Sequence, residues 1–89
     1  MANFTGMDIA EVRNLASQLD HAAEEIKHLT SQLSSKLHAT SWVGHDRETF
    51  LNDWQSQHQA RLNQVSEALN NAAQVARRNA DEQEQVSNV

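Results

Sequence analysis

The chain has 89 residues and a formal net charge of −5, with no cysteine, no proline and only 2 glycines. This length leaves room for one small domain, and the absence of cysteine excludes a disulfide framework and a thiolate metal site. The acidic balance, 12 Asp and Glu against 7 Lys and Arg, is spread over both halves. Because phosphate backbones need a clustered basic face, nucleic acid is not an expected partner.

Scarce turn residues limit the architecture. Proline interrupts helices, and β-hairpins or α/β units need turn residues at regular intervals. The composition therefore predicts an all-α hairpin of two long antiparallel helices joined by a turn near Gly44. No apolar run approaches the roughly 20 residues that span a bilayer. The sequence Met-Ala-Asn-Phe-Thr-Gly at the N-terminus lacks the basic and apolar regions of a signal peptide, so any export is expected to be leaderless.

The first helix is predicted over about residues 8–38. Asp8 and Glu11 form a capping-box arrangement, and Met7 and Val12 are spaced for a hydrophobic staple. Apolar residues recur at intervals of three and four, which predicts a heptad seam. The seam residues are Val12, Leu15, Leu19, Ala22, Ile26, Leu29 and Leu33, and the flanking apolar residues are Ile9, Ala16, Ala23 and Leu37.

A turn over about residues 39–45 leads to a second helix predicted over 46–80, with Asp46 as its N-cap. Its seam is richer in alanine, so each contact buries less apolar area. From residue 81 the chain becomes polar, and we expect a flexible tail over 81–89. The residues on or next to the second seam are Phe50, Leu51, Trp54, His58, Leu62, Val65, Leu69, Ala72, Val75 and Ala76.

Both apolar stripes are wider than a two-helix contact requires. A lone hairpin would leave one side of each stripe in water, so we expect a second hairpin to complete a four-helix bundle. The predicted dimer interface comprises Val12, Leu15, Leu19, Ile26, Leu29, Leu33, Phe50, Trp54, Leu62, Val65 and Leu69.

The 5 histidines suggest a metal-binding bundle as an alternative. Glu25 and His28 have the spacing of ferritin-like ligands, but they flank the seam, which places them on a solvated face. His21 and His28 are seven residues apart, whereas zinc-binding histidines on one helix lie at i and i+4. His58 occupies a seam position and is predicted to be a half-buried bundle histidine. We therefore expect no metal.

Catalytic motifs are also missing from the sequence. The serines have no strand-to-helix nucleophile elbow, and no glycine-rich loop is available for phosphate. We expect no enzyme, no catalytic residue, no cofactor and no small-molecule substrate.

The sequence Ser41-Trp42-Val43-Gly44 stands at the break between the helices. Gly44 is explained locally, because a residue that redirects the chain often needs a positive φ. Trp42 in a short polar turn either packs over the open end of the bundle or is displayed to a partner. Physical reasoning alone favours packing.

A cysteine-free chain of this length, with two amphipathic helices separated by Trp-X-Gly, resembles the WXG family of early-secreted-antigen-like proteins exported by type VII (ESX) secretion systems. The resemblance covers the whole chain. It implies a hairpin that dimerises antiparallel, with itself or with a related WXG-type protein, into a four-helix bundle. It also implies synthesis in the cytoplasm, secretion without a signal peptide and engagement by the secretion ATPase.

The family's bipartite export signal combines the Trp-X-Gly turn of one subunit with a Tyr-x-x-x-Asp/Glu segment that follows helix 2 of the other. Trp42 and Gly44 match the first part and Asp81 matches the acidic position, but Arg77 stands at the tyrosine position and the chain has 0 tyrosines. The resemblance makes Trp42 a recognition residue. It leaves open a homodimer with a variant tail or a heterodimer whose partner supplies an intact tail. The alternative function is a cytosolic coiled-coil adaptor or export chaperone that is not itself secreted.

Overall fold

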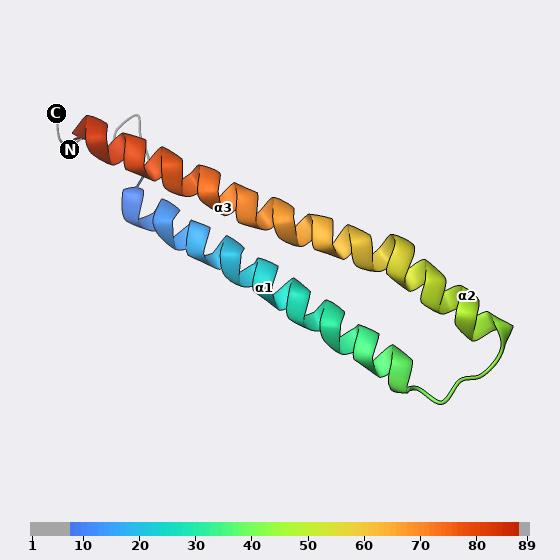
Figure 1. The fold of residues 1–89 in the computed structure, drawn as a ribbon. Helices are drawn as coiled ribbons and strands as arrows, with labels where there is room; N and C mark the ends of the chain where they lie inside the picture. The colour runs from blue at the N-terminus through green and yellow to red at the C-terminus, as the bar shows by residue number, and fades with distance from the viewer. Residues whose placement is uncertain (1–7, 88–89) are drawn as a thin grey trace.

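The computed structural model describes residues 8–87, which form one helical hairpin (Figure 1). Helix α1 spans Ile9–Ala39. After a short turn, α2 (His45–Asp53), the π-helix η1 (Trp54–His58) and α3 (Gln59–Ser87) follow one another without a break. No strand occurs within residues 8–87, and the hairpin measures 66 × 17 × 15 Å. The predicted all-α hairpin of two long antiparallel arms is confirmed.

Helix α1 begins and ends with side-chain caps. The carboxylate of Asp8 accepts a hydrogen bond from the backbone N–H of Glu11 at 3.1 Å, which confirms the predicted N-cap. Met7, the other half of the predicted staple, lies outside the described residues. At the C-terminal end the hydroxyl of Thr40 donates to the carbonyl oxygen of Lys36 at 2.6 Å. This bond satisfies one of the carbonyl groups that a helix end leaves without a partner.

Helix α2 begins at His45, and its N-cap is Gly44 rather than the predicted Asp46. Gly44 has φ 125° and ψ −177°, a region that side-chain-bearing residues essentially avoid. A Cβ atom there would meet nothing within 4 Å, so the backbone conformation rather than the available space requires glycine. Asp46 and Glu48 lie in the first turn of α2, where the helix dipole favours negative charge.

Helices α1 and α3 pack through small residues. Ala16 and Ala23 on α1, and Ser66, Ala73 and Ala80 on α3, are fully buried. The hydroxyl of Ser66 donates to the carbonyl oxygen of Ala23 at 3.0 Å, which fixes the antiparallel register. Steps of seven along both helices then place Ala16 at the level of Ala73. Small side chains let the two backbones approach closely, although each contact buries little apolar area.

The row of α1 that faces α3 is one row away from the predicted seam. This row contains buried Thr30. Its other members were predicted to flank the seam. Three leucines of the predicted seam, Leu15, Leu29 and Leu33, are 50%, 55% and 52% exposed. The smallest side chains permit the closest approach, so they turn toward α3 and the leucines extend to one side. The buried or half-buried row of α1 comprises Ile9, Ala16, Ala23, Thr30 and Leu37, with Val12, Leu19 and Ile26 beside it.

The π-helix η1 changes which residues of the second arm point toward α1. Half-buried Trp54 is followed on the inward side by Gln59, five residues later, rather than by His58. A π-turn contains one residue more than an α-turn, so it rotates the following residues relative to a continuous α-helix. His58 is exposed, and its predicted half-buried position is therefore wrong.

The same shift corrects the predicted second seam. Val65 and Val75 are 49% and 48% exposed, and Ala72 is also exposed. A continuous α-helix from Trp54 would turn these residues inward, and the extra residue of η1 moves them to the flank. The residues that face α1 are Leu62, Ser66, Leu69, Ala73, Ala76 and Ala80.

The predicted flexible tail is wrong for residues 81–87, because α3 continues to Ser87. Burial of Ala80 and a side-chain contact from Arg13 to Asp81 and Glu84 hold this stretch against α1. Residues 88–89 of the predicted tail lie outside the described residues.

Candidate functional site

The turn between α1 and α2 carries the Trp-X-Gly sequence. The indole ring of Trp42 lies 5.5 Å from the ring of Phe50, with the planes tilted by 58°, a favourable arrangement for two aromatic rings. Trp42 nevertheless remains 37% exposed, and Val43 is 93% exposed. The turn therefore combines packing on Phe50 with display of apolar surface at one end of the hairpin.

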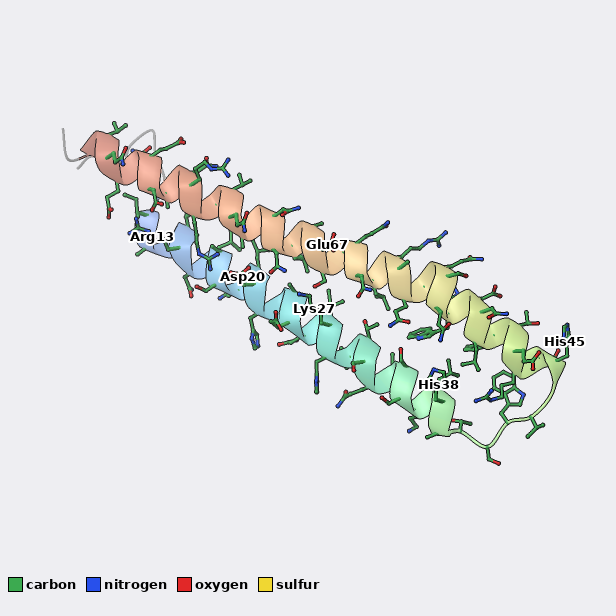
Figure 2. All side chains as sticks on the ribbon, in the orientation of Figure 1. Arg13, Asp20, Lys27, His38, His45 and Glu67 are labelled. Carbon is green, nitrogen blue, oxygen red and sulfur yellow. The ribbon has the colours of Figure 1, made fainter. Side chains whose placement is uncertain are left out.

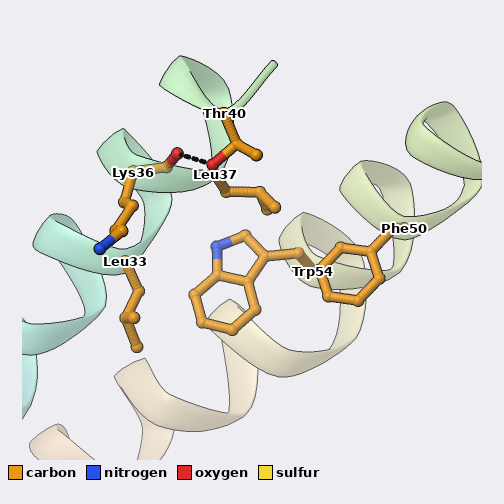
Figure 3. Close-up of a pocket in the computed structure, with 6 residues that line it drawn as sticks. All are labelled: Leu33, Lys36, Leu37, Thr40, Phe50 and Trp54. Carbon is orange, nitrogen blue, oxygen red and sulfur yellow. Dashed lines mark hydrogen bonds between the residues drawn. The ribbon is translucent and has the colours of Figure 1, made fainter. Parts of the chain in front are cut away.

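A pocket of about 240 Å³ lies beside the turn, between α1 and the start of the second arm. The indole N–H of Trp54 donates to the hydroxyl of Ser34 at 2.7 Å, and this bond orients the ring across the two arms. Figure 3 shows the rings of Trp54 and Phe50 facing the leucines of α1. The pocket is lined by Leu33, Lys36, Leu37, Thr40, Phe50 and Trp54, so its wall is apolar apart from Lys36 and Thr40.

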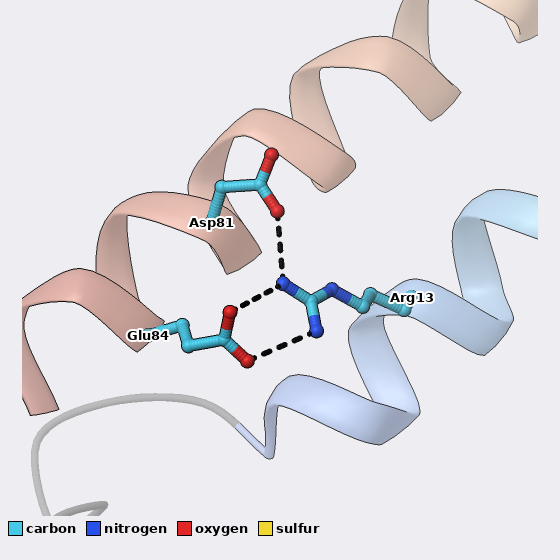
Figure 4. Close-up of polar contacts among 3 residues, drawn as sticks. All are labelled: Arg13, Asp81 and Glu84. Carbon is cyan, nitrogen blue, oxygen red and sulfur yellow. Dashed lines mark hydrogen bonds and ion pairs between the residues drawn. The ribbon is translucent and has the colours of Figure 1, made fainter. Parts of the chain in front are cut away.

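At the opposite end of the hairpin, Arg13 of α1 binds two carboxylates of α3 (Figure 4). Its Nη1 and Nη2 atoms donate to the two oxygens of Glu84, each at 3.2 Å, and Nη2 also donates to Asp81 at 2.9 Å. The hydrogen bonds to Glu84 and then to Asp81 raise the pKa of Arg13 above its ordinary value. We call this group of three residues the Arg13 clamp.

A second cross-helix ion pair joins Arg77 and Asp20 at 2.7 Å. Arg77 occupies the position where the resemblance calls for tyrosine, and its guanidinium is bound to α1 of the same chain. Arg13 and Asp20 are seven residues apart on α1, as are Arg77 and Glu84 on α3. Figure 2 shows Arg13, Asp20 and Lys27 in succession along α1. One edge of the hairpin is therefore polar and crossed by ion pairs.

The other edge is apolar. Leu15, one residue before inward Ala16, lies on one side of the inward row, whereas Arg13, three residues before it, lies on the other. On α3, Val65 likewise comes one residue before inward Ser66. Because the two right-handed helices run antiparallel, Leu15 and Val65 point to the same side of the hairpin. We define the apolar face as Val12, Leu15, Leu19, Ile26, Leu29, Leu33, Leu62, Val65, Leu69, Ala72 and Val75.

The residues of the predicted dimer interface all lie on this apolar face or at its turn end, where Phe50 and Trp54 line the pocket. The two parts of the predicted recognition motif are separated. Trp42 and Gly44 lie in the turn, and Asp81 lies near the other end of a hairpin 66 Å long (Figure 1). Within one chain they cannot form a single surface.

Sequence reasoning missed the residues that make the polar edge, namely Arg13, Asp20 and Glu84. A signal for them was present, because charges of opposite sign recur at seven-residue spacing beside the small-residue rows. The pairing of these charges follows only from the register of the two arms, and the register depends on η1.

Within residues 8–87, no group of three or more acidic or histidine side chains is placed to hold a metal ion. Glu25 of the metal hypothesis pairs with His21 at 2.7 Å. None of the helices in this described part has the length and hydropathy that a membrane span requires. Comparison with family models, curated proteins and solved structures finds no match to the chain.

Proposed function

We propose that the chain is a non-enzymatic helical hairpin that acts as a dimer in type VII (ESX) secretion, as an exported protein or as an adaptor. Its partners are a second copy or a related WXG-type protein, together with the secretion ATPase. As an exported protein it is made in the cytoplasm and leaves the cell through the secretion system. The observation that carries the proposal is the apolar face, which lies open along one edge of a hairpin whose other edge is closed by ion pairs.

An apolar face of this kind favours a protein partner. The fully buried apolar residues among those described are alanines, and the exposed Leu15, Leu29 and Leu33 contribute little to the core of the hairpin itself. A short chain with so little burial is marginal alone. Extended exposed apolar patches are uncommon on monomeric proteins and mark interaction sites. A second hairpin would bury the leucines of both chains and supply the missing stabilisation.

Antiparallel pairing suits the spacing of the α1 residues on this face. Rotation about a point near Glu24 places Leu15 of one hairpin opposite Leu33 of the other, because both are nine residues from that point. The same rotation brings Lys36 of one chain opposite Val12 of the other, one residue from Glu11, which adds charge complementarity at each end. The apolar rows and the charged ends thus favour one arrangement.

Antiparallel pairing would also unite the separated motif, since the turn of one hairpin then lies beside the end of α3 in the other. In a homodimer that end carries Arg77, which is bound to Asp20 in its own chain. A related partner with an intact Tyr-x-x-x-Asp/Glu segment would place an aromatic ring beside Trp42. We therefore propose a heterodimer as the exported form.

The dimer is tested by Leu29→Asp, with Ser31→Asp as the matched control on the same helix. Leu29 is 55% exposed in the hairpin, so the substitution is mild for a monomer. In a dimer it buries an unpaired charge, at several kcal/mol. We expect sedimentation equilibrium to show a dimer for the unmodified chain and for Ser31→Asp, and a monomer with reduced helicity for Leu29→Asp. A stable helical monomer that tolerates Leu29→Asp, and that also forms no dimer with a related WXG-type protein, contradicts the proposal.

Export is tested in a secreting host by expressing the chain alone and with a neighbouring WXG-type protein. We expect export to require the partner and to fall with Trp42→Ala, while most of the helicity remains. Val43→Ala is the control, because Val43 lies in the same turn and is 93% exposed. Retention of the unmodified chain in the cells, with or without the partner, would favour the cytosolic adaptor. Efficient export of the chain alone would favour the homodimer.

A further inference from the structure

The apolar rows of α1 are symmetric about Glu24. Their residues follow one another at alternating steps of three and four, and the order of the steps is the same from either end. Lys36 belongs to this pattern, because it comes seven residues after Leu29 and therefore continues the same row. In an antiparallel pair centred at Glu24, Val12 of one chain lies at the level of Lys36 of the other. The residues of the pattern are Val12, Leu15, Leu19, Ala22, Ile26, Leu29, Leu33 and Lys36.

The pocket at the turn end lies at the level of Lys36. It has a volume of about 240 Å³, and Leu33 and Lys36 on its wall belong to the rows of the apolar face. Leu33 and Phe50 remain 52% and 47% exposed, so the chain's own side chains leave the pocket open. Figure 3 shows the ring of Trp54 between the leucines of α1 and Phe50. An apolar side chain from outside the hairpin would remove this surface from water.

Val12 has the right direction to enter such a pocket. It comes four residues before inward Ala16, so its side chain lies beside the inward row and points toward the midline of the hairpin. The pocket of a facing hairpin also lies on the midline, because both arms line it. A face-to-face antiparallel pair therefore brings Val12 of each chain over the pocket of the other.

The charges beside this contact are complementary. Glu11 lies in the first turn of α1 and Lys36 in its last turn. Both side chains are exposed, and among the described residues neither forms an ion pair within the hairpin. When Lys36 of one chain is opposite Val12 of the other, it is one residue from Glu11 of that chain. Opposite charges placed in this way favour a single register of the two facing chains.

We propose that Val12 of a second copy of this chain occupies the pocket, and that Lys36 of the pocket wall pairs with Glu11 of that copy. The contact occurs twice in the dimer, once at each end. The inference rests on the dimer of the proposed function and identifies the residues that set its register. It concerns the pair of identical chains that forms when no related partner is present.

Cross-linking through introduced cysteines tests the contact, since the chain has no cysteine of its own. The variants Val12→Cys and Lys36→Cys are unfolded, mixed, refolded together and oxidised. Positions 12 and 36 are 24 residues apart on one helix, which is about 36 Å, whereas a disulfide needs Cα atoms within about 7 Å. A bridge between the two positions must therefore join two chains. We expect mass spectrometry to show 12–36 bridges as the main product, with few 12–12 or 36–36 bridges.

Ser17→Cys and Ser31→Cys are the matched control pair. Both serines are exposed and equally distant from Glu24. They directly follow the inward residues Ala16 and Thr30, so they lie on the side of α1 away from the apolar face. We expect little bridging of this pair. Predominant 12–12 bridges would mean a parallel dimer, and equal yields from the two pairs would mean random collision. Either result overturns the proposal.

The ion pair is tested by the dissociation constant of the dimer. Exposed ion pairs are weak, but the dimer contains two copies, so Lys36→Met and Glu11→Gln should each raise the dissociation constant roughly two- to thirtyfold. Residues 11 and 36 lie near opposite ends of α1, so coupling between the two changes must arise between chains. The double variant should therefore dissociate no more readily than the single variants. Lys27→Met, on the polar edge, should leave the dissociation constant unchanged.

Failure of this inference is distinguishable from failure of the proposed function. A dimer without 12–36 bridges overturns the inference and leaves the proposed function standing. Additive losses in Lys36→Met and Glu11→Gln overturn the ion pair between the copies. A monomeric unmodified chain overturns the second copy as the occupant of the pocket, whereas export with a related partner still decides the proposed function.

Discussion

The two ends of the hairpin hold their arms together in different ways. The terminal end, where α1 begins and α3 finishes, is packed through Ala16, Ala73 and Ala80 and is bound by the Arg13 clamp. At the turn end Trp54 reaches across to Ser34, and the arms leave a pocket of about 240 Å³ between them. Figure 1 shows the arms diverging toward α2, in agreement with the packing of α1 mainly on α3.

Side-chain size explains this difference. Rows of alanine and serine let the two backbones approach closely. The hydroxyl of Ser66 on α3 then reaches the backbone carbonyl oxygen of Ala23 on α1. Leucine and tryptophan hold the arms apart, and two helices cannot surround such large groups. The terminal end is thus closed by the chain itself, and the turn end keeps exposed apolar surface at Leu33, Val43 and Phe50. The π-helix η1 lies between the two modes of packing.

The strongest test of this comparison enlarges a side chain at the close contact. Ala23→Leu should lower the free energy of unfolding by about 1–3 kcal/mol, because an inserted leucine forces the backbones apart. It would also displace Ser66, whose hydroxyl donates to the carbonyl oxygen of Ala23. Urea unfolding followed by circular dichroism, at one fixed protein concentration, measures the effect.

Ala68→Leu is the control for that substitution, since Ala68 is an exposed alanine on α3. It should change the free energy of unfolding by no more than about 0.5 kcal/mol. Equal losses in the two variants would show that close approach of the arms is not what stabilises the hairpin.

A smaller effect is expected from the turn end. Trp54→Phe keeps an aromatic ring and removes the indole N–H that donates to Ser34 at 2.7 Å, so it should cost about 0.5–1.5 kcal/mol. Ser34→Ala removes the acceptor of the same bond. The two losses should be non-additive in a double-mutant cycle, because both changes break one interaction. Fully additive losses would mean that the hydrogen bond does not hold the arms together.

Much of the fold could be predicted from local features of the sequence. Helix content, the N-cap at Asp8 and a turn at Gly44 follow from composition, cap chemistry and the one well-placed glycine. The face of each helix was harder to predict. An apolar stripe three rows wide does not show which row meets the other helix, and the small-residue rows are less hydrophobic than the leucine rows beside them.

The candidate site could be predicted in part. Trp42 and the leucines of the apolar face are conspicuous in the sequence, but the outward position of the α1 leucines depends on the small-residue row beside them, and that of Val65 depends on η1. A single extra residue in a helical turn leaves the average hydrophobic period almost unchanged, so the pattern did not reveal it. The Arg13 clamp joins residues 68 and 71 positions apart, and such pairs follow only from a known register.

The smallest predicted effect concerns the alkaline behaviour of the Arg13 clamp. The pKa of Arg13 is raised in the folded chain by Glu84 and then by Asp81. A group with a raised pKa stabilises the folded state fully below its ordinary pKa, and the stabilisation is lost only as the pH rises through the raised value. For arginine that loss falls above about pH 12, so the clamp should be constant between about pH 7 and 11. The ¹³Cα shift of Val86, in the last turns of α3, should therefore keep its helical value over this range. In Arg13→Lys the ammonium should lose its charge near the top of the same range, since lysine ordinarily titrates at about pH 10.4. The Val86 shift should then move toward its random-coil value in that variant alone.

A parallel change of the Val86 shift in both proteins would contradict a role of the clamp. It would mean that the whole terminal end loosens at high pH, which the packed alanines should prevent.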